Sequence, residues 1–306
     1  MTKGFVTMAT GDERYYKMAV NLLNSYRYFT KKPYKFAIIS DQKNEYTDQF
    51  DDVVIIENTQ KNYMDKIRLL EICPYDENIF IDADCLAYSD LNSYWKVFEN
   101  TDDFSAFGKT FPVDSTLGWY NKDTIGAFGD RIKYVTHLHG VIYFIRPGAV
   151  CNQMLELCYK IIENYNEYNI TGFPEAADEP VFAIAMGIMD LKPVTRKTEY
   201  YVFLPIADYI NADISKGYLE YGFGENEKTN KGMLVHWANV NIDKALYKKE
   251  TMQLRFMTKK QEINYKQVNT YYKQCKTEDK KKEKIKRRLE RKSELKSKIY
   301  KIVKRW

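Results

Sequence analysis

Two aspartates follow a strongly apolar run in the segment Ile79 to Asp84, whose sequence is IFIDAD. The apolar residues predict a buried strand, and the carboxyl end of such a strand in an open α/β sheet faces the ligand crevice. Asp82 and Asp84 are one residue apart, so both can turn toward one hard cation, and their oxygens suit Mg²⁺ or Mn²⁺. Because about one Asp-x-Asp is expected by chance in such a chain, a solvated pair in a turn is the competing interpretation.

A histidine, His236, ends another apolar segment over residues 232–237, far along the chain. An imidazole beside two carboxylates would favour Mn²⁺ over Mg²⁺. A single histidine at such a position is more often structural than a ligand. The sequence does not show whether His236 meets Asp82 and Asp84.

The elements that must position these residues alternate between strands and helices. Apolar runs predict strands over residues 5–9, 35–39, 52–56, 78–82, 140–145 and 232–237, and helical spacing covers 15–28, 67–72 and 148–165. Continuous apolar runs indicate strands that are covered on both faces. The pattern predicts an α/β fold with a Rossmann-like, mostly parallel central sheet and helices on both faces. Residues 109–136 and 205–230 are interpreted as long loops, which are often functional.

The composition is that of a globular protein. The chain has 306 residues, 44% of them hydrophobic and 29% charged. No apolar run approaches the roughly 18 residues of a membrane span. The first residues lead directly into a predicted strand, so no signal peptide is expected. The five cysteines (Cys73, Cys85, Cys151, Cys158, Cys275) follow no pattern, which favours buried thiols in a reducing compartment over disulfides or a zinc site.

Charge is distributed unevenly along the chain. Residues 277–306 hold 14 Lys and Arg against 5 Asp and Glu, whereas the rest holds 33 against 37. A mildly acidic body argues against a nucleic-acid-binding protein. Apolar residues of the basic tail lie mostly three or four positions apart, which is typical of an amphipathic helix on anionic lipid; they are Ile285, Leu289, Leu295, Ile299, Ile302, Val303 and Trp306. A solvated charged helix and an RNA-binding arm are the alternatives.

Over about residues 4–245, the order of motifs resembles a retaining glycosyltransferase of the GT-A fold. It is similar to family 8, which includes glycogenin and bacterial lipooligosaccharide galactosyltransferases. The segment Phe5 to Asp12, followed by Tyr15, resembles the strand and loop that hold the uracil of a UDP-sugar. Lys66 lies where the family places a lysine near the nucleotide and sugar. Asp82 and Asp84 match the metal motif, including the small Ala83 between them.

The second half of the resemblance concerns catalysis. His139-Gly140 resembles an Asn-Ser-Gly strand of the family, and His236 resembles its histidine ligand. Glu175, followed by Asp178 and Glu179, resembles an acidic residue followed by Asp-Gln. Glu179 therefore replaces an amide, and could serve as a nucleophile or accept a hydrogen bond from a sugar hydroxyl. Independently of the resemblance, acidic residues before Pro180 also fit a helix N-terminus.

The sequence departs from the family after His236. The family has a glycine and then a lysine that grips the diphosphate, but Asn239 and Ile242 stand in those places. Lys244 is a possible substitute for that lysine. A more distant subgroup of the GT-A fold is therefore an equally good match.

The resemblance implies a metal-dependent retaining enzyme that moves a hexose from a UDP-sugar to a glycan, lipid-linked or glycoprotein acceptor. The cofactor would be Mn²⁺ or Mg²⁺, bound by Asp82, Asp84 and His236. Asp178 and Glu179 are the candidate catalytic residues; the candidate donor-binding residues are Thr7, Met8, Ala9, Thr10, Tyr15, Lys66, Asp82, Ala83, His139, Gly140, Glu175 and Lys244.

We expect a catalytic domain over residues 1–247 and a helical region over 248–306, with its tail on the cytoplasmic face of a membrane. Phe111, Trp119, Tyr120 and Trp237 are candidates to stack on an acceptor sugar, although such aromatic residues also pack loops. No nucleic-acid partner is expected. The alternative is a catalytically silent binding or scaffold protein with the same fold, tethered by its tail.

Overall fold

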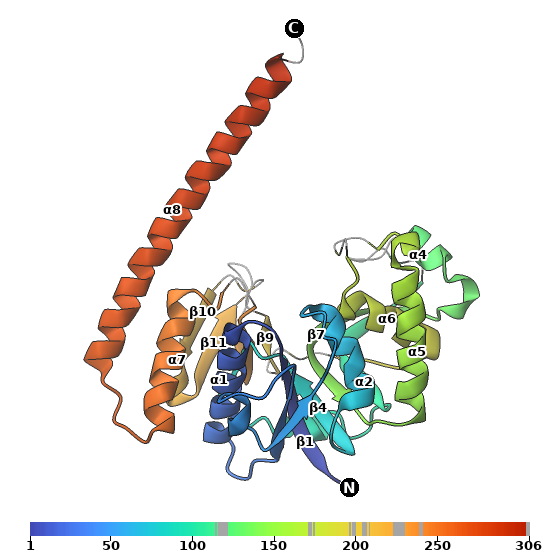
Figure 1. Ribbon diagram of the computed structural model, residues 1–306, viewed down its shortest axis with the longest axis horizontal. Helices are drawn as coiled ribbons and strands as arrows, with labels where there is room; N and C mark the ends of the chain where they lie inside the picture. The colour runs from blue at the N-terminus through green and yellow to red at the C-terminus, as the bar shows by residue number, and fades with distance from the viewer. Residues whose placement is uncertain are drawn as a thin grey trace.

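The computed structural model describes the chain except residues 114, 116–121, 171–172, 174, 196, 198–199, 204–206, 208, 223–229, 239–240 and 304–306 (Figure 1). Its centre is a seven-stranded sheet in the order β3-β2-β1-β4-β7-β6-β8. The strands are β1 (Lys3–Ala9), β2 (Lys35–Ser40), β3 (Asp52–Ile55), β4 (Glu77–Ile81), β6 (Phe104–Phe111), β7 (Val135–Ile145) and β8 (Val194–Thr195). Within this sheet only β7 runs against the others, because it pairs antiparallel with both β4 and β6. The predicted mostly parallel α/β fold is confirmed.

Helices cover both faces of the sheet. They are α1 (Glu13–Phe29) on one face, and α2 (Leu69–Ile72), α5 (Ala149–Glu163) and α6 (Asp178–Met189) on the other. Successive strand residues enter opposite cores: Phe5 packs with the α1 side and Val6 with the α2, α5 and α6 side. This two-sided burial explains why the central strands carry continuous apolar runs.

Two small sheets complete the body, and the second of them corrects the long loop expected over 205–230. One has the order β5-β13-β9, built from Cys85–Ala87, Leu234–His236 and Val202–Phe203. The other has the order β10-β11-β12, built from Tyr209–Asp213, Tyr218–Gly222 and Asn230–Lys231. In the long loop expected over 109–136, β6 reaches Phe111, α4 covers Lys122–Gly126 and β7 begins at Val135. The strands of the two small sheets are two to five residues long, which is too short for an apolar run to mark most of them, and pairing with a neighbour supplies their backbone hydrogen bonds.

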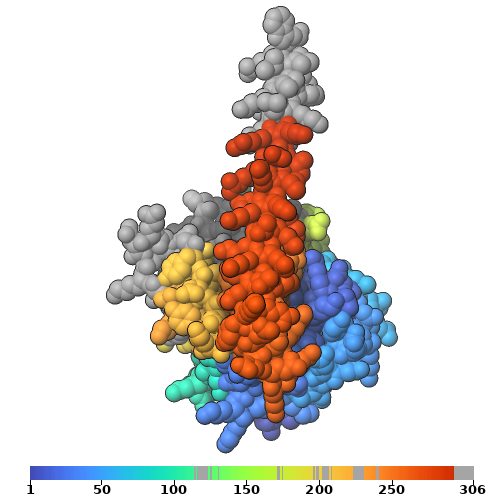
Figure 2. All heavy atoms as spheres, turned by 90° about the vertical axis from the view of Figure 1, so that its left-hand side faces the viewer, coloured from blue at the N-terminus to red at the C-terminus, as the bar shows by residue number. Residues whose placement is uncertain are grey.

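The last two helices are α7 (Ala245–Thr258) and α8 (Tyr265–Val303). The predicted boundary at residue 247 falls inside α7, where the buried Glu250 accepts a hydrogen bond from Tyr88. The far half of α8 projects beyond the body (Figures 1 and 2). The division into two units remains a prediction.

The tail is helical, as expected, and two members of its apolar stripe are visible. Ile285 and Leu289 are 55% and 61% exposed. The side chains of Leu295, Ile299, Ile302, Val303 and Trp306 lie outside the described residues. Among the described helices, none is both long enough and apolar enough to cross a membrane.

All five cysteines are buried, and none forms a disulfide. The expectation of buried thiols is confirmed.

Candidate active site

Asp82, Asp84 and His236 converge on one point of the structure. One donor atom from each lies within 4.8 Å of the others. The Nε2 atom of His236 is 3.1 Å from Oδ1 of Asp84 and 3.8 Å from Oδ2 of Asp82. All three side chains are between 12% and 15% exposed, so the cluster is largely but not completely buried.

Strand pairing brings the histidine to the aspartates. Asp82 and Asp84 lie in the turn between β4 and β5, where the Asp82 N–H donates to the carbonyl of Val141 on β7. Strand β5 then pairs antiparallel with β13, which sets His236 opposite Cys85. The N–H of Trp237 donates to the carbonyl of Asp84 and closes this pairing. The pairing of the three-residue strands β5 and β13 thus brings together His236 and Asp84, which are about 150 residues apart in the sequence.

Lys66 connects this cluster to the first turn of α6. It lies in a 3₁₀ helix over Tyr63–Arg68, and its ammonium group is 2.7 Å from Asp82 and 3.4 Å from Asp178. It also donates to the carbonyl oxygen of Gly140 at 3.0 Å. One lysine therefore joins the end of β4, the middle of β7 and the start of α6.

The pair Asp178-Glu179 begins α6, as expected from Pro180 and the helix dipole. Asp178 is 2% exposed and accepts a hydrogen bond from the hydroxyl of Tyr143 at 2.7 Å. Glu179 accepts the N–H of Gly140 at 2.7 Å. A Cβ on Gly140 would lie 2.8 Å from Glu179 Cγ and 2.9 Å from Asp178 Oδ2, so only glycine allows β7 and α6 to approach this closely.

The pKa values in the cluster are shifted by burial and by these charges. Burial raises the pKa of Asp82 to about 6 against the attraction of Lys66. Burial also opposes ionisation of Asp84, but His236 outweighs it and holds the pKa of Asp84 below its usual value. The same pairing raises the pKa of His236 despite burial. Burial and the neighbouring Asp178 raise the pKa of Glu179 to about 7. The shifts mark this region as chemically unusual, as active sites commonly are.

The donor set fits a divalent cation. Two carboxylates and one imidazole, all reaching one point, match the ligand preferences of Mn²⁺ and also allow Mg²⁺. His236 must lose its proton to act as a ligand, so protons would compete with the metal.

The predicted donor segment, Thr7 to Thr10, covers the end of β1 and the first residue after it, at the same edge of the sheet. The side chains of Thr7 and Ala9 are buried, whereas Met8 and Thr10 are partly exposed. Tyr15 is half-buried in the first turn of α1, and its hydroxyl accepts a hydrogen bond from Arg14 at 2.9 Å.

Two of the predicted residues, Glu175 and Lys244, are not joined to the cluster within the described part of the chain. Among the described residues, no hydrogen bond or ion pair joins the exposed Glu175 or the exposed Lys244 to it. His139 is half-buried on β7, and its ring lies 5.4 Å from that of His137. Ile242, in the place of the family's lysine, is buried, while Asn239 lies outside the described residues.

The suggestion that Trp237 stacks on an acceptor sugar is wrong in this structure. Trp237 is 1% exposed and packs edge-on against Tyr247 with ring centroids 5.3 Å apart, so its faces are covered. Phe111 is half-buried at the end of β6. Trp119 and Tyr120 lie outside the described residues.

Two residues of this region were missed by sequence reasoning. Asp41 follows β2 and accepts two hydrogen bonds, one from the N–H of Gly11 at 3.1 Å and one from the hydroxyl of Tyr16. These bonds fix the position of the chain just after the donor segment. The position of Asp41 directly after an apolar strand was a usable signal, the same one that marked Asp82. Tyr143, whose hydroxyl donates a hydrogen bond to Asp178, lies inside a buried strand. Nothing in its sequence context distinguished it from a core residue.

A scan against models of known protein families gives no match, and neither does a search of curated proteins. Solved structures do match. The bifunctional glycosyltransferase WbbM aligns over 83% of this chain and 49% of its own, with 11% identity and a TM-score of 0.51. The glycosyltransferase GlyE of Streptococcus pneumoniae TIGR4 aligns over 66% of this chain and 47% of its own, with 13% identity and a TM-score of 0.45. Mouse xyloside xylosyltransferase 1 aligns over 66% and 87%, with 12% identity and a TM-score of 0.44.

This chain spans about half the length of WbbM and of GlyE. The likeness to WbbM, together with the strand order, shows that the chain has the fold of the GT-A glycosyltransferases. Fold alone does not assign an activity.

Proposed function

We propose that this protein is a metal-dependent glycosyltransferase that moves a hexose from a UDP-sugar to a glycan, lipid-linked or glycoprotein acceptor, with retention at the anomeric carbon. The single observation that carries the proposal is the convergence of Asp82, Asp84 and His236 at the carboxyl edge of a GT-A sheet. That edge is where ligands bind in open α/β folds.

In this proposal, Asp82, Asp84 and His236 hold the divalent ion. When bound, the ion would supply positive charge to a leaving diphosphate. The donor segment from Thr7 to Thr10, with Tyr15, would hold the nucleotide. Lys66 would fix the relative positions of β4, β7 and α6 through Asp82, Gly140 and Asp178. Such positioning lowers the entropic part of the barrier. Glu175, His139 and Lys244 are also proposed to contact the donor.

Asp178 and Glu179 are proposed as the catalytic pair. A Glu179 pKa of about 7 means that the carboxyl group is partly ionised near neutral pH. It could therefore supply a negative charge to an oxocarbenium-like centre, or accept a proton. The N–H of Gly140 fixes one carboxylate oxygen, which leaves the other for substrate.

The basic tail is proposed to hold the enzyme at the cytoplasmic face of a membrane. The exposed Ile285 and Leu289 lie on a helix whose other surface is rich in Lys and Arg. Apolar contact combined with attraction to anionic lipid is the binding mode of interfacial helices.

Release of UDP from UDP-Glc, UDP-Gal and UDP-GlcNAc, with GDP-Man for comparison and with or without Mn²⁺, tests the proposal. We expect Mn²⁺-dependent release from one UDP-sugar, which Asp84→Asn reduces to background without unfolding the chain. Asp48→Asn is the matched control, because Asp48 is exposed and remote in sequence from the cluster.

The variant Glu179→Gln separates the two catalytic roles. If Glu179 is a nucleophile, the variant should lose its transferase activity; if Glu179 only accepts a hydrogen bond, the variant should keep most of it. If no UDP-sugar is turned over at all, the proposal is overturned in favour of a silent binding or scaffold protein of the same fold. If the Asp84→Asn variant keeps its turnover, Asp84 is not a ligand of the metal ion.

A further inference from the structure

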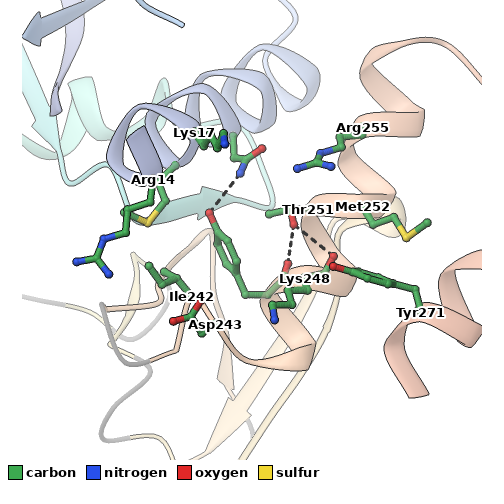
Figure 3. Close-up of a pocket in the computed structure, with 12 residues that line it drawn as sticks. Arg14, Lys17, Ile242, Asp243, Lys248, Thr251, Met252, Arg255 and Tyr271 are labelled. Atoms are coloured by element: carbon green, nitrogen blue, oxygen red, sulfur yellow. Dashed lines mark hydrogen bonds between the residues drawn. The ribbon is translucent and has the colours of Figure 1, made fainter. Parts of the chain in front are cut away.

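A cavity lies on the α1 face of the molecule, between α1, α7 and α8 (Figure 3). Its volume is about 440 Å³, within the range of small-molecule sites. None of its lining residues belongs to the Asp82, Asp84 and His236 cluster. No part of the proposed transfer reaction uses this cavity.

The cavity is cationic although the body of the chain is not. Arg14 and Lys17 reach it from α1, and Lys248 and Arg255 reach it from α7. Among the described lining residues, Asp243 alone is acidic. Residues 1–276 hold 33 Lys and Arg against 37 Asp and Glu, so four cations in one hollow depart from the surrounding balance.

Two of these cations are unengaged within the described part of the chain. Lys17 is paired with Glu13 at 2.6 Å, and Arg14 donates to Tyr15. The side chains of Lys248 and Arg255, in contrast, make no hydrogen bond or ion pair with any described residue. In Figure 3 the guanidinium group of Arg255 extends from α7 toward α1, into the region between the two helices. Unpaired cations that face one hollow favour an anionic ligand.

The remaining wall is mostly apolar and aromatic, with Asn21 and Thr251 as its polar members. Met18, Ile242 and Met252 contribute apolar side chains, and Tyr271 reaches from α8 toward α7. An inorganic anion would gain nothing from these surfaces, whereas an amphiphile would bury its first methylene groups against them. Inorganic phosphate and a phosphorylated lipid share the phosphate group that the cations would bind. The apolar wall favours the lipid of the two.

We propose that this cavity binds the headgroup of a phosphorylated lipid, with the phosphate between Lys248 and Arg255 and the first part of the acyl chains along Met18, Met252 and Tyr271. The site lies where α8 leaves the body, so a membrane that the basic tail contacts would present such headgroups to it. Binding at this site requires neither donor nor metal, so it stands or falls independently of the proposed sugar transfer.

Calorimetry on the full chain with dioctanoyl phosphatidic acid, below its micelle concentration and without metal, tests the proposal. Binding should be saturable with one site, and inorganic phosphate and dioctanoylglycerol should each bind at least about tenfold more weakly. The double variant Lys248→Gln/Arg255→Gln should lose at least about tenfold in affinity for the phosphorylated lipid. Its midpoint of thermal unfolding should match that of the unaltered chain.

The control removes the same charge from an exposed turn. Lys31→Gln/Lys32→Gln lies outside the cavity and should leave the affinity unchanged. If both double variants lose affinity for the phosphorylated lipid equally, the binding reflects general charge attraction and the proposed site is wrong. Equal binding of inorganic phosphate would overturn its assignment to a lipid, and so would the absence of saturable binding.

Discussion

The ammonium group of Lys66 lies 2.7 Å from Asp82 and 3.4 Å from Asp178, so a single lysine forms ion pairs with two carboxylates that belong to different parts of the candidate site. The side chain of Lys66 is 15% exposed, and that of Asp178 is 4% exposed. Charges this deeply buried are costly when they are unpaired. The geometry of the whole site therefore depends on Lys66 even before any substrate is present.

Replacing Lys66 by methionine should lower the free energy of unfolding by about 3 kcal/mol, because two buried carboxylates lose their cation. Urea unfolding at neutral pH without metal measures the effect. Lys35→Met is the matched control: Lys35 is 63% exposed and pairs with Asp52, and the loss of such a surface pair should cost at most about 1 kcal/mol. Equal losses in the two variants would contradict the role given to Lys66.

The Glu179→Gln variant should become more stable than the unaltered chain as the pH rises. The pKa of Glu179 is raised from 4.5 to about 7, so the folded state holds this proton more tightly than the unfolded state does. The stabilisation is complete below about pH 4.5 and is lost as the pH rises through about 7.

The glutamine variant does not titrate and keeps an oxygen to accept the N–H of Gly140. Denaturation without metal should show near-equal stabilities at pH 5 and an advantage of about 2 kcal/mol for the variant at pH 8. A difference that does not change with pH would show that Glu179 ionises normally.

Addition of Mn²⁺ should stabilise the fold at equilibrium. At one hundred times its dissociation constant, a ligand that binds only the folded state adds about 2.7 kcal/mol. The stabilisation should be greater at pH 8 than at pH 6, because Asp84 raises the pKa of His236 and protons then compete with the metal. Thermal unfolding with and without EDTA at both pH values measures this, and Asp84→Asn should abolish the shift while Asp48→Asn keeps it.

Removal of the tail should release the protein from membranes and leave donor hydrolysis intact. The cut belongs after Glu283, because Asp279 accepts the N–H of Ala245 at the start of α7, a contact worth about 1 kcal/mol. This truncation removes 11 Lys and Arg and two acidic residues. Binding to vesicles that contain anionic lipid should fall by more than about tenfold in sedimentation, since each basic residue contributes about 1 kcal/mol. Unchanged sedimentation would count against the anchor.

Much of the fold followed from local pattern. The apolar runs that became β1, β2 and β4 are continuous because both faces of the sheet are covered, and α1 has clear helical spacing. In contrast, of the small sheets β5-β13-β9 and β10-β11-β12 only β13 was predicted, as part of the strand expected over residues 232–237. Their strands are two to five residues long, so their existence depends on partners distant in the sequence.

For the site, the sequence by itself determined which groups were available: carboxylates after an apolar strand, one late histidine, and an acidic pair before a proline. These follow from residue type and from short-range spacing, which the chain carries locally. Only the tertiary structure decided that His236 lies beside Asp84, that Lys66 bridges Asp82 and Asp178, and that Trp237 is covered rather than presented to a sugar. The physical reason is that these relationships arise from pairing and packing between segments far apart in the chain, which local residue preferences do not encode.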